Sequence, residues 1–404
     1  MAEIIVMKQF IPYICVAFVA FVTTFVLVPV AKKIAIRTDA VDYPSKRRIN
    51  KHPVPRLGGI AIFCGLVAAC ITQIFGTWYL DWPPALVPHP SLTVNYPMVA
   101  AAFTIIFATG VIDDIYQLSP KAKLAGQVLA AAVATAGGLT LGSVLNPFIT
   151  GQFIQLGWIS WPITIIYLVA FANIINLIDG LDGLATGISG IAAFTMFTLA
   201  VLAQRVDAAA LSIALVGCCL AFLRYNFNPA SIFLGDSGSL LLGFALGTIS
   251  LLNMSRTAAL TSMIMPLIVA GVPILDTFSA IVRRKRAHIS IGQADKGHIH
   301  HRLIQEGYNQ KQAVLLIYAW CIVLSAGATL INQVPIVTRI VVFVVLVVLS
   351  AIIAVKLHLF EPVLLHHYNP STKKDELITP DNPEFAKEEQ ETLENHGNRH
   401  KSKK

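Results

Sequence analysis

The stretch Asn173-Ile-Ile-Asn176-Leu-Ile-Asp179-Gly-Leu-Asp182-Gly183 lies between two apolar segments, residues 163–171 and 184–203. Its four polar side chains recur at every third position. On a helix a step of three residues advances the side chain by about 300°, so successive members drift by only about 60° and share one face. The glycine after each aspartate loosens the backbone where the helix has to end.

Two amides followed by two carboxylates form an all-oxygen surface, which suits a hard cation such as Mg²⁺. The alternative interpretation is a polar helix end followed by an N-cap for the next helix. A carboxylate inside a membrane is costly and is by default functional, so we favour the cation-binding interpretation.

The composition is that of a membrane protein. A mean hydropathy of +0.69, with 55% apolar and 13% charged residues, is not typical of a soluble domain. Eleven segments approach the ~20 residues needed to cross the hydrocarbon of a bilayer. They are residues 10–30, 57–75, 97–112, 122–141, 162–177, 184–203, 208–223, 237–253, 260–282, 313–331 and 336–355. We therefore predict an all-α polytopic fold of about 11 transmembrane helices. Pro266, Gly271 and Pro273 predict a kink or break in the ninth.

The distribution of Lys and Arg predicts the orientation. If the loop after the first span is cytoplasmic and the spans alternate, all Lys and Arg residues except Lys8, Arg205, Arg256 and Arg339 fall on the inside. The positive-inside rule then places the N-terminus outside and the C-terminus in the cytoplasm. The net charge of +8 indicates anchoring to anionic lipid or substrate rather than to nucleic acid.

The composition changes near residue 361, where Pro, Lys, Glu and Asn replace the apolar pattern. We expect an integral membrane domain over residues 1–360 and a disordered cytoplasmic tail over residues 361–404.

Two motifs precede the central stretch on the predicted cytoplasmic side. Lys51 and Arg56 flank two prolines and lead into Gly58-Gly59, a stiff basic approach to a helix N-terminus that could bind phosphate. A plain topogenic basic loop is the alternative. Asp113 and Asp114 are adjacent like charges, which both ionise easily only near cations or a metal. A solvated interfacial pair is the alternative for them.

Two further motifs follow it. Asp236 lies among Gly and Ser just before an apolar helix, where it could cap the helix or bind a cation, and Phe233 could stack on a base or simply pack. His298, His300 and His301 could bind a transition metal, but the neighbouring basic residues, Arg302 among them, favour an anion site for phosphate oxygens.

The acidic residues gather on one side of the predicted membrane. Outside loops hold only Asp81 and Asp207 among the aspartates, whereas the cytoplasmic side holds Asp113, Asp114, Asp179, Asp182, Asp236, Asp276 and Asp295. A secondary transporter would scatter acids by depth and show broken helices in matching halves. Carboxylates and amides for Mg²⁺, with Lys, Arg and His for phosphate, instead indicate phosphoryl transfer at a membrane surface.

The chain resembles the polyprenyl-phosphate N-acetylhexosamine-1-phosphate transferases, specifically their WecA/TagO-like branch. The resemblance covers residues 10–355 and rests on five motifs in order: Pro55-Arg-Leu-Gly-Gly59, Val111-Ile-Asp-Asp114, the stretch from Asn173 to Gly183, Phe233-Leu-Gly-Asp-Ser-Gly238 and His298-x-His-His-Arg302. It implies a plasma-membrane enzyme, with its active site on the cytoplasmic face, that takes part in teichoic acid, O-antigen or other surface glycopolymer synthesis.

The implied reaction transfers a sugar 1-phosphate from a UDP-N-acetylhexosamine to undecaprenyl phosphate and releases UMP. The implied cofactor is Mg²⁺, with Mn²⁺ as a substitute, held by Asn176 and Asp236. Asp113 and Asp114 would lie where the lipid phosphate is activated, with Asp113 as the base or positioning group. Whether the lipid phosphate attacks directly or through a covalent aspartyl-phosphate is left open by the sequence.

The resemblance also implies the substrate contacts. The nucleotide and sugar diphosphate would be held by Lys51, Arg56, Asn173, Asp179, Asp182, Asn226, Phe233, His298, His300, His301 and Arg302. Relatives that use UDP-N-acetylmuramoyl-pentapeptide normally show three consecutive His followed by an aromatic residue. This chain has His-Ile-His-His-Arg at 298–302, so we expect UDP-N-acetylglucosamine as donor. A homodimer is compatible with the sequence.

Overall fold

Helices occupy the predicted apolar segments, in a computed structural model that describes residues 2–43, 52–87, 94–145, 153–254, 270–286, 297–331, 333–360, 365–369 and 374–378. The helices are α1 (Ala2–Arg37), α2 (Gly59–Tyr79), α3 (Tyr96–Tyr116), α4 (Pro120–Ala136), α5 (Ser160–Ile178), α6 (Leu184–Leu202), α7 (Val206–Asn226), α8 (Gly235–Met254), α10 (Gly271–Arg286), α11 (Ile299–Gln305), α12 (Gln310–Ile331) and α13 (Ile336–Lys356).

Nine helices within these described ranges are long and apolar enough to cross a membrane. Helices α4, with 17 residues, and α10, with 16, lie on the other two predicted spans and are shorter. The chain is therefore an all-α multi-pass membrane protein. The orientation of its termini stays a prediction. So does a break in the ninth span, because α10 begins at Gly271 and residues 255–269 lie outside the described ranges.

The strands form three short antiparallel pairs. They are β1 (Val41–Asp42) with β2 (Val54–Pro55), β3 (Ser143–Leu145) with β4 (Phe153–Gln155), and β5 (Leu365–Asn369) with β6 (Lys374–Ile378). A 3₁₀ turn, Gly157–Ile159, leads into α5. Strands β5 and β6 are the only residues of the tail, 361–404, that the structure describes. The disorder of this tail and the domain boundary at residue 360 stay predictions.

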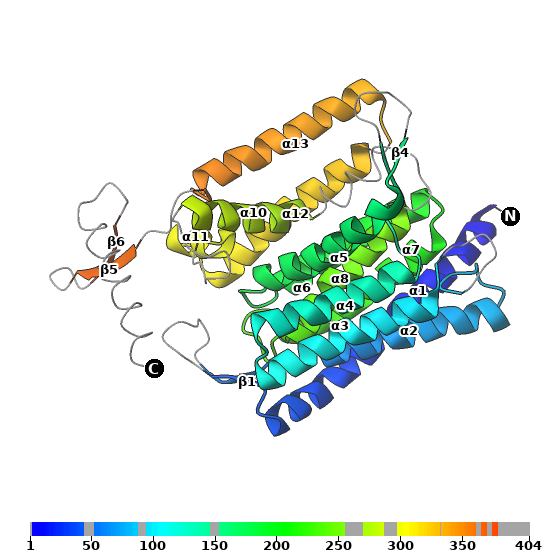
Figure 1. Cartoon of the computed structure of the whole chain (residues 1–404), viewed down its shortest axis with the longest axis horizontal. Coiled ribbons are helices and arrows are strands. Elements are labelled where there is room, and N and C mark those ends of the chain that lie inside the picture. The colour runs from blue at the N-terminus through cyan, green and yellow to red at the C-terminus, as the bar shows by residue number, and fades with distance from the viewer. Residues whose placement is uncertain are drawn as a thin grey trace.

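Helices α1 to α8 lie side by side, with α12 and α13 along one flank and α11 at one end (Figure 1). Helix α8 is the centre of this arrangement, because it packs against α3, α5, α6, α2 and α7. In the apolar stretch of α8, 89% of the residues are buried inside the protein, compared with 11% in the apolar stretch of α13. A helix that is apolar on every side is expected to be surrounded by protein or lipid, and α8 is surrounded by protein.

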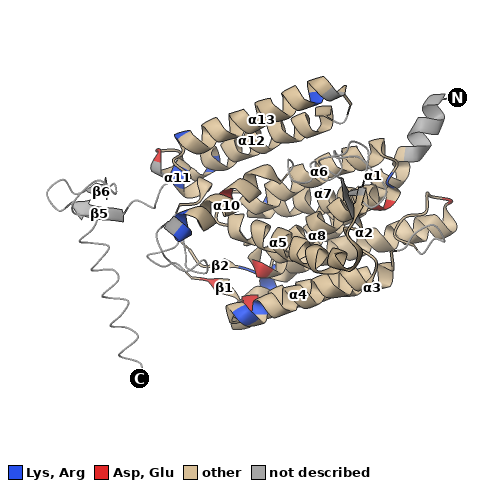
Figure 2. Cartoon of the chain, turned by 45° about the horizontal axis from the view of Figure 1, so that its top comes forward, with Lys and Arg blue, Asp and Glu red and all other residues tan. Residues whose placement is uncertain are grey.

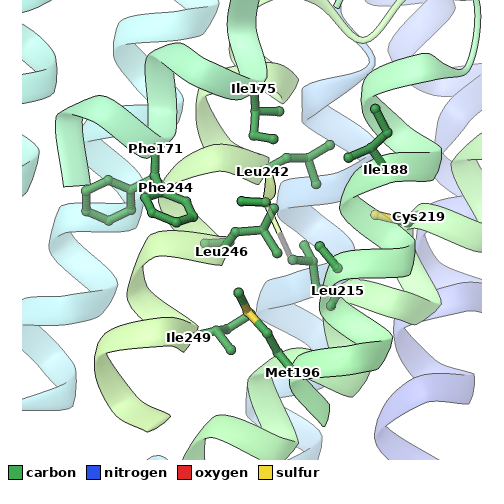
Figure 3. Packing of buried hydrophobic residues seen from close by; sticks show 14 of the residues in the cluster. Phe171, Ile175, Ile188, Met196, Leu215, Cys219, Leu242, Phe244, Leu246 and Ile249 are labelled. Atoms are coloured by element: carbon green, nitrogen blue, oxygen red, sulfur yellow. The ribbon is translucent and has the colours of Figure 1, made fainter. Parts of the chain in front are cut away.

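Figure 3 shows part of the core beside α8, to which α5, α6 and α7 contribute side chains. Phe171 of α5, Ile188 of α6 and Leu215 of α7 lie around Leu242 and Leu246 of α8, and all are buried. Lipid tails are as apolar as these side chains, so close packing rather than transfer from water holds the helices together.

Two glycines let α2 and α3 approach the start of α8. A Cβ on Gly59 would lie 2.4 Å from the backbone N of Gly238, and a Cβ on Gly110 would lie 2.4 Å from Cα of Ser237. Real side chains do not tolerate such distances, so only glycine permits this contact. The end of α3 is thereby brought directly beside the beginning of α8.

The central polar stretch is only partly helical. Helix α5 ends at Ile178, so Asn173 and Asn176 are helical, whereas Asp179 is the C-cap and Asp182 lies in the following turn. The prediction that all four side chains share one helix face is therefore wrong beyond Asn176. The reason is the turn itself, in which Gly183 takes a left-handed φ of +80°.

Candidate active site

The ammonium group of Lys123, in the first turn of α4, lies among three oxygen-bearing side chains. Its Nζ is 3.1 Å from Oδ2 of Asp113, 2.9 Å from Oδ1 of Asp236 and 3.3 Å from Oδ1 of Asn176. These residues come from α3, α8 and α5. The Asp236 side chain retains 30% exposure, so the cluster is open to an approaching ligand.

Asn176 connects the cluster to α8. Its Nδ2 donates to Oδ1 of Asp236 at 2.5 Å and to Oγ of Ser239 at 2.8 Å. The two residues predicted to hold the metal, Asn176 and Asp236, are thus in direct contact.

Asp114 holds the beginning of α8 rather than facing Lys123. Its Oδ1 accepts from the backbone N of Asp236 at 2.8 Å, and its Oδ2 accepts from the backbone N of Ser237 at 2.9 Å. A carboxylate at this position satisfies the unpaired N–H groups of the helix and complements its dipole. Gly235, with φ +71°, is needed there, because a Cβ would lie 2.5 Å from Oδ2 of Asp114.

Arg56 and Phe233 lie beside the beginning of α8, where a Cβ on Gly235 would lie 2.3 Å from the backbone O of Arg56. Nη2 of Arg56 donates to the backbone O of Asp114 at 2.7 Å. The backbone of Phe233 pairs with the segment before α2, because its N donates to Pro55 O and its O accepts from Gly58 N. Lys51, predicted as a phosphate-binding residue, lies outside the described residues, as does Asp295.

Asn173 and Gln127 form an amide pair between α5 and α4. Nδ2 of Asn173 donates to Oε1 of Gln127 at 2.6 Å and to the backbone O of Val169 at 2.8 Å. Asn173 was predicted to contact substrate, and the structure places it one helical turn from Asn176, against α4.

Asp182 and Asn226 organise the loop between α7 and α8. Oδ2 of Asp182 accepts from Asn228 Nδ2 at 2.9 Å and from Ala230 N at 3.0 Å. Oδ1 of Asn226 accepts from Gly183 N at 3.1 Å, and its Nδ2 donates to Ile232 O at 3.0 Å. Both residues thus join the acidic turn after α5 to the loop that carries Phe233.

Asp179 lies at the end of α5, near three other acids. Burial, followed by the negative charges of Asp236, Asp114 and Asp182, raises the pKa of Asp179 to about 8. Such crowding of carboxylates is the situation that a divalent cation relieves.

The histidine motif forms the short helix α11 and reaches the acidic turn. A Cβ on Gly180 would lie 2.5 Å from Cε1 and Nε2 of His300, so the imidazole contacts the glycine directly. His298, His300 and Arg302 are buried, and His301 is half-buried. Burial, with the neighbouring His301, lowers the pKa of His300 to about 3, so the ring is neutral near pH 7. Its Nδ1 has no hydrogen-bond partner among the described residues.

Charged side chains gather at one end of the bundle, beside β1, β2, the start of α4 and helices α10 and α11 (Figure 2). Among the described residues, acids and bases therefore lie together at this end, and its cytoplasmic placement stays a prediction. Lys123 was missed as a site residue, because in the sequence it is one basic residue of a short loop. The signal that could have found it is its position nine and ten residues after the adjacent acid pair Asp114 and Asp113.

The donor set fits a hard divalent cation. Two carboxylates and one amide oxygen already converge on a single positive group, the Lys123 ammonium. All-oxygen donors of this kind are those that Mg²⁺ prefers. Among the described residues no group of three or more His, Cys, Asp or Glu side chains could hold a metal, so this set combines carboxylates with the amide oxygen of Asn176.

Comparisons with known proteins bear on the same residues. A family model described as "Glycosyl transferase family 4" matches residues 96–254, which include Asp113, Asn176 and Asp236. The chain is 38% identical over 342 residues to the "Probable undecaprenyl-phosphate N-acetylglucosaminyl 1-phosphate transferase" of Bacillus subtilis (strain 168), covering 84% of this chain and 91% of that protein.

Two other relatives are named for different activities. The "Decaprenyl-phosphate N-acetylglucosaminephosphotransferase" of Mycolicibacterium smegmatis is 34% identical, over 78% of this chain and 80% of that protein. The "Phospho-N-acetylmuramoyl-pentapeptide-transferase" of Moorella thermoacetica is 30% identical, over 69% of this chain and 85% of that protein.

Proposed function

We propose, because the chain belongs to glycosyl transferase family 4, that it transfers N-acetylglucosamine 1-phosphate from UDP-N-acetylglucosamine to undecaprenyl phosphate. An oxygen of the lipid phosphate would attack the β-phosphorus of the donor, the bond from that phosphorus to the bridging oxygen would break, and UMP would leave. The observation that carries the proposal is the convergence of Asp113, Asp236 and Asn176 on one cationic group.

Mg²⁺ is the cofactor that this donor set would take, held by Asn176 and Asp236, with Mn²⁺ as a substitute. When bound, a divalent ion neutralises negative charge on a diphosphate. Lys123 supplies a second positive charge at the same place, where it can stabilise the oxygens of the transferring phosphate.

Asp113 and Asp114 take different parts in this proposal. Asp113, in contact with Lys123, would position the lipid phosphate or accept its proton. Asp114 would act by holding the start of α8, and therefore Asp236, in place.

The donor substrate would lie between the acidic turn and the basic groups. His300, whose neutral ring lies against Gly180, would contact the diphosphate, while Arg56 and Arg302 would supply positive charge. Asp179, Asp182, Asn226 and Phe233 would line the approach for the uridine, and Lys51 would contact the diphosphate. Asn173 would act through its contact with Gln127.

The site would face the cytoplasm at the plasma membrane. That placement follows from the Lys and Arg distribution, and it lets a water-soluble nucleotide meet a lipid acceptor at one surface. The alternative donor is UDP-N-acetylmuramoyl-pentapeptide, which the 30% identical Moorella relative supports. The sequence His-Ile-His-His-Arg and the two relatives named for N-acetylglucosamine favour the first donor.

The test is product formation by the purified full-length chain. It is incubated with undecaprenyl phosphate, Mg²⁺ and a panel of UDP-sugars, and lipid diphosphate-sugar and UMP are detected by mass spectrometry. Asp236→Asn should lower the rate by about 10²–10³. Asp207→Asn is the matched control, because Asp207 accepts from Leu86 N at 2.7 Å, in the loop after α2 and away from the Lys123 cluster. No product from any UDP-sugar with a folded chain would contradict the proposal.

A further inference from the structure

Asp276 of α10 is a fully buried carboxylate that the proposed reaction leaves without a role. The side chain is 1% exposed. Its Oδ2 lies 2.8 Å from Nδ1 of His298, and its Oδ1 accepts from the backbone N of Ile299 at 2.8 Å. The two oxygens of Asp276 therefore bind one residue each, His298 and Ile299, at the beginning of α11.

Helix α11 needs an anchor from elsewhere in the chain. It has seven residues, and a helix of that length is not stable without tertiary contacts. His298, its N-cap residue, makes no side-chain cap to the helix. Asp276 supplies the missing acceptor for an N–H group in the first turn, which is the part that a capping side chain normally plays.

The contact with His298 also decides the state of its ring. An ionised carboxylate can only accept a hydrogen bond, so Nδ1 of His298 must carry the proton when it faces Asp276. A carboxylate that binds one ring nitrogen fixes both the tautomer and the orientation of an imidazole.

A continuous set of contacts runs from this pair to the acidic turn. The rings of His298 and His300 are nearly parallel, at 6°, with centroids 5.8 Å apart. His300 in turn lies against Gly180, between Asp179 and Asp182. Asp276, His298, His300 and Gly180 thus connect α10 to the turn after α5.

We infer that Asp276 is a positioning residue, which holds the first turn of α11 and the His298 ring so that His300 is placed against the acidic turn. The catalytic consequence rests on the proposed function, whereas the structural consequence does not. Asp276 acts through His298 and touches no reacting atom.

Two variants separate the two contacts. In Asp276→Asn the amide oxygen can still accept from Ile299 N, but the amide nitrogen can only donate to Nδ1 of His298, which moves the ring proton to Nε2. Asp276→Ala loses both contacts. Asp207→Asn is again the matched control, as an acid that accepts from a remote backbone N–H.

Hydrogen–deuterium exchange of the full-length chain in detergent tests the anchor without any substrate. We expect the peptide over residues 298–305 to exchange at least about tenfold faster in Asp276→Ala, and at the wild-type rate in Asp276→Asn, because only the first variant leaves the Ile299 amide unpaired. Peptides of α8 should be unchanged in both. Unchanged exchange of residues 298–305 in Asp276→Ala would overturn the inference.

Steady-state kinetics test whether Asp276 acts through the His298 ring. We expect kcat/KM for the UDP-sugar to fall about 10- to 100-fold in Asp276→Asn, although its α11 is anchored. In a His298→Ala background the same substitution should cost less than about threefold, because the ring through which it acts is gone. Wild-type activity of Asp276→Asn would overturn the inference. If the wild-type chain itself makes no product, the proposed function fails, and the exchange experiment still decides whether Asp276 anchors α11.

Discussion

The side-chain amide of Asn173 meets that of Gln127 between α5 and α4, and it does so one helical turn from the contact of Asn176 with Lys123. Residues three and four apart share a helix face, so the two contacts lie on the same facing sides of the two helices. The amide pair therefore sets the register in which the ammonium group reaches Asp236.

Asn173→Ala should lower both the melting temperature and the turnover rate. The substitution leaves the Gln127 amide unpaired, and an interhelical hydrogen bond in a membrane is worth about 0.6 kcal/mol on average and up to about 2. Gln127→Ala should have the same effects, measured by thermal unfolding in detergent and by UMP release.

The exchanged pair, Gln127→Asn with Asn173→Gln, is the control and should recover most of the lost activity. A rise in KM for the UDP-sugar in Asn173→Ala, with Gln127→Ala unaffected, would instead support direct contact of Asn173 with substrate.

Lys123→Gln should lower kcat by about 10²–10³, because it removes a positive charge that both Asp113 and Asp236 contact. Steady-state UMP release at saturating Mg²⁺ measures the effect. Lys121→Gln is the matched control, an exposed lysine two residues earlier on α4. Equal activity of the two variants would rule out a part for Lys123 in the reaction.

Gly110→Ala should destabilise the protein by about 1–3 kcal/mol and lower its melting temperature, since the added methyl would press on the backbone at Ser237. It should also lower turnover, because the start of α8 carries Asp236. Gly142→Ala serves for comparison, because a Cβ there meets nothing within 4 Å. Similar melting temperatures for the two variants would show that the α3–α8 contact can relax.

Acid should destabilise the protein through His300. The pKa of His300 is lowered to about 3 in the folded state, so between that value and its ordinary 6.5 only the unfolded chain binds the proton. Stability is then complete above about pH 6.5 and falls by about 1.4 kcal/mol per pH unit as the pH decreases below it.

The melting temperature of the wild-type chain, measured from pH 7 to pH 5, should therefore drop more steeply than that of His300→Gln. Parallel curves would indicate that His300 takes up its proton in the folded protein as readily as in the unfolded one.

The sequence predicts the helices well, because apolar segments and positive charges are local signals. The same holds for the acid motifs, whose glycines mark helix boundaries near Asp179 and Asp236. The contact between Asn176 and Asp236 was expected from the family resemblance and is present in the structure.

Contacts between distant segments are the part that local patterns do not contain. Nothing near Asp114 in the sequence indicates that both its oxygens bind α8, 122 and 123 residues later. The Asp276 contact with His298 is of the same kind, as is the position of Lys123. Each depends on how helices pack, which periodicity does not report.

Helix α8 has a mechanical consequence for the enzyme. A bilayer that is thicker or thinner than the apolar length of a span makes that span tilt or shift. Such strain acts first on helices in contact with lipid, such as α13, whereas α8 is enclosed by its neighbours. We therefore expect the position of Asp236, in the first turn of α8, to change little with bilayer thickness. Turnover in vesicles of short-chain and long-chain lipids should then differ little.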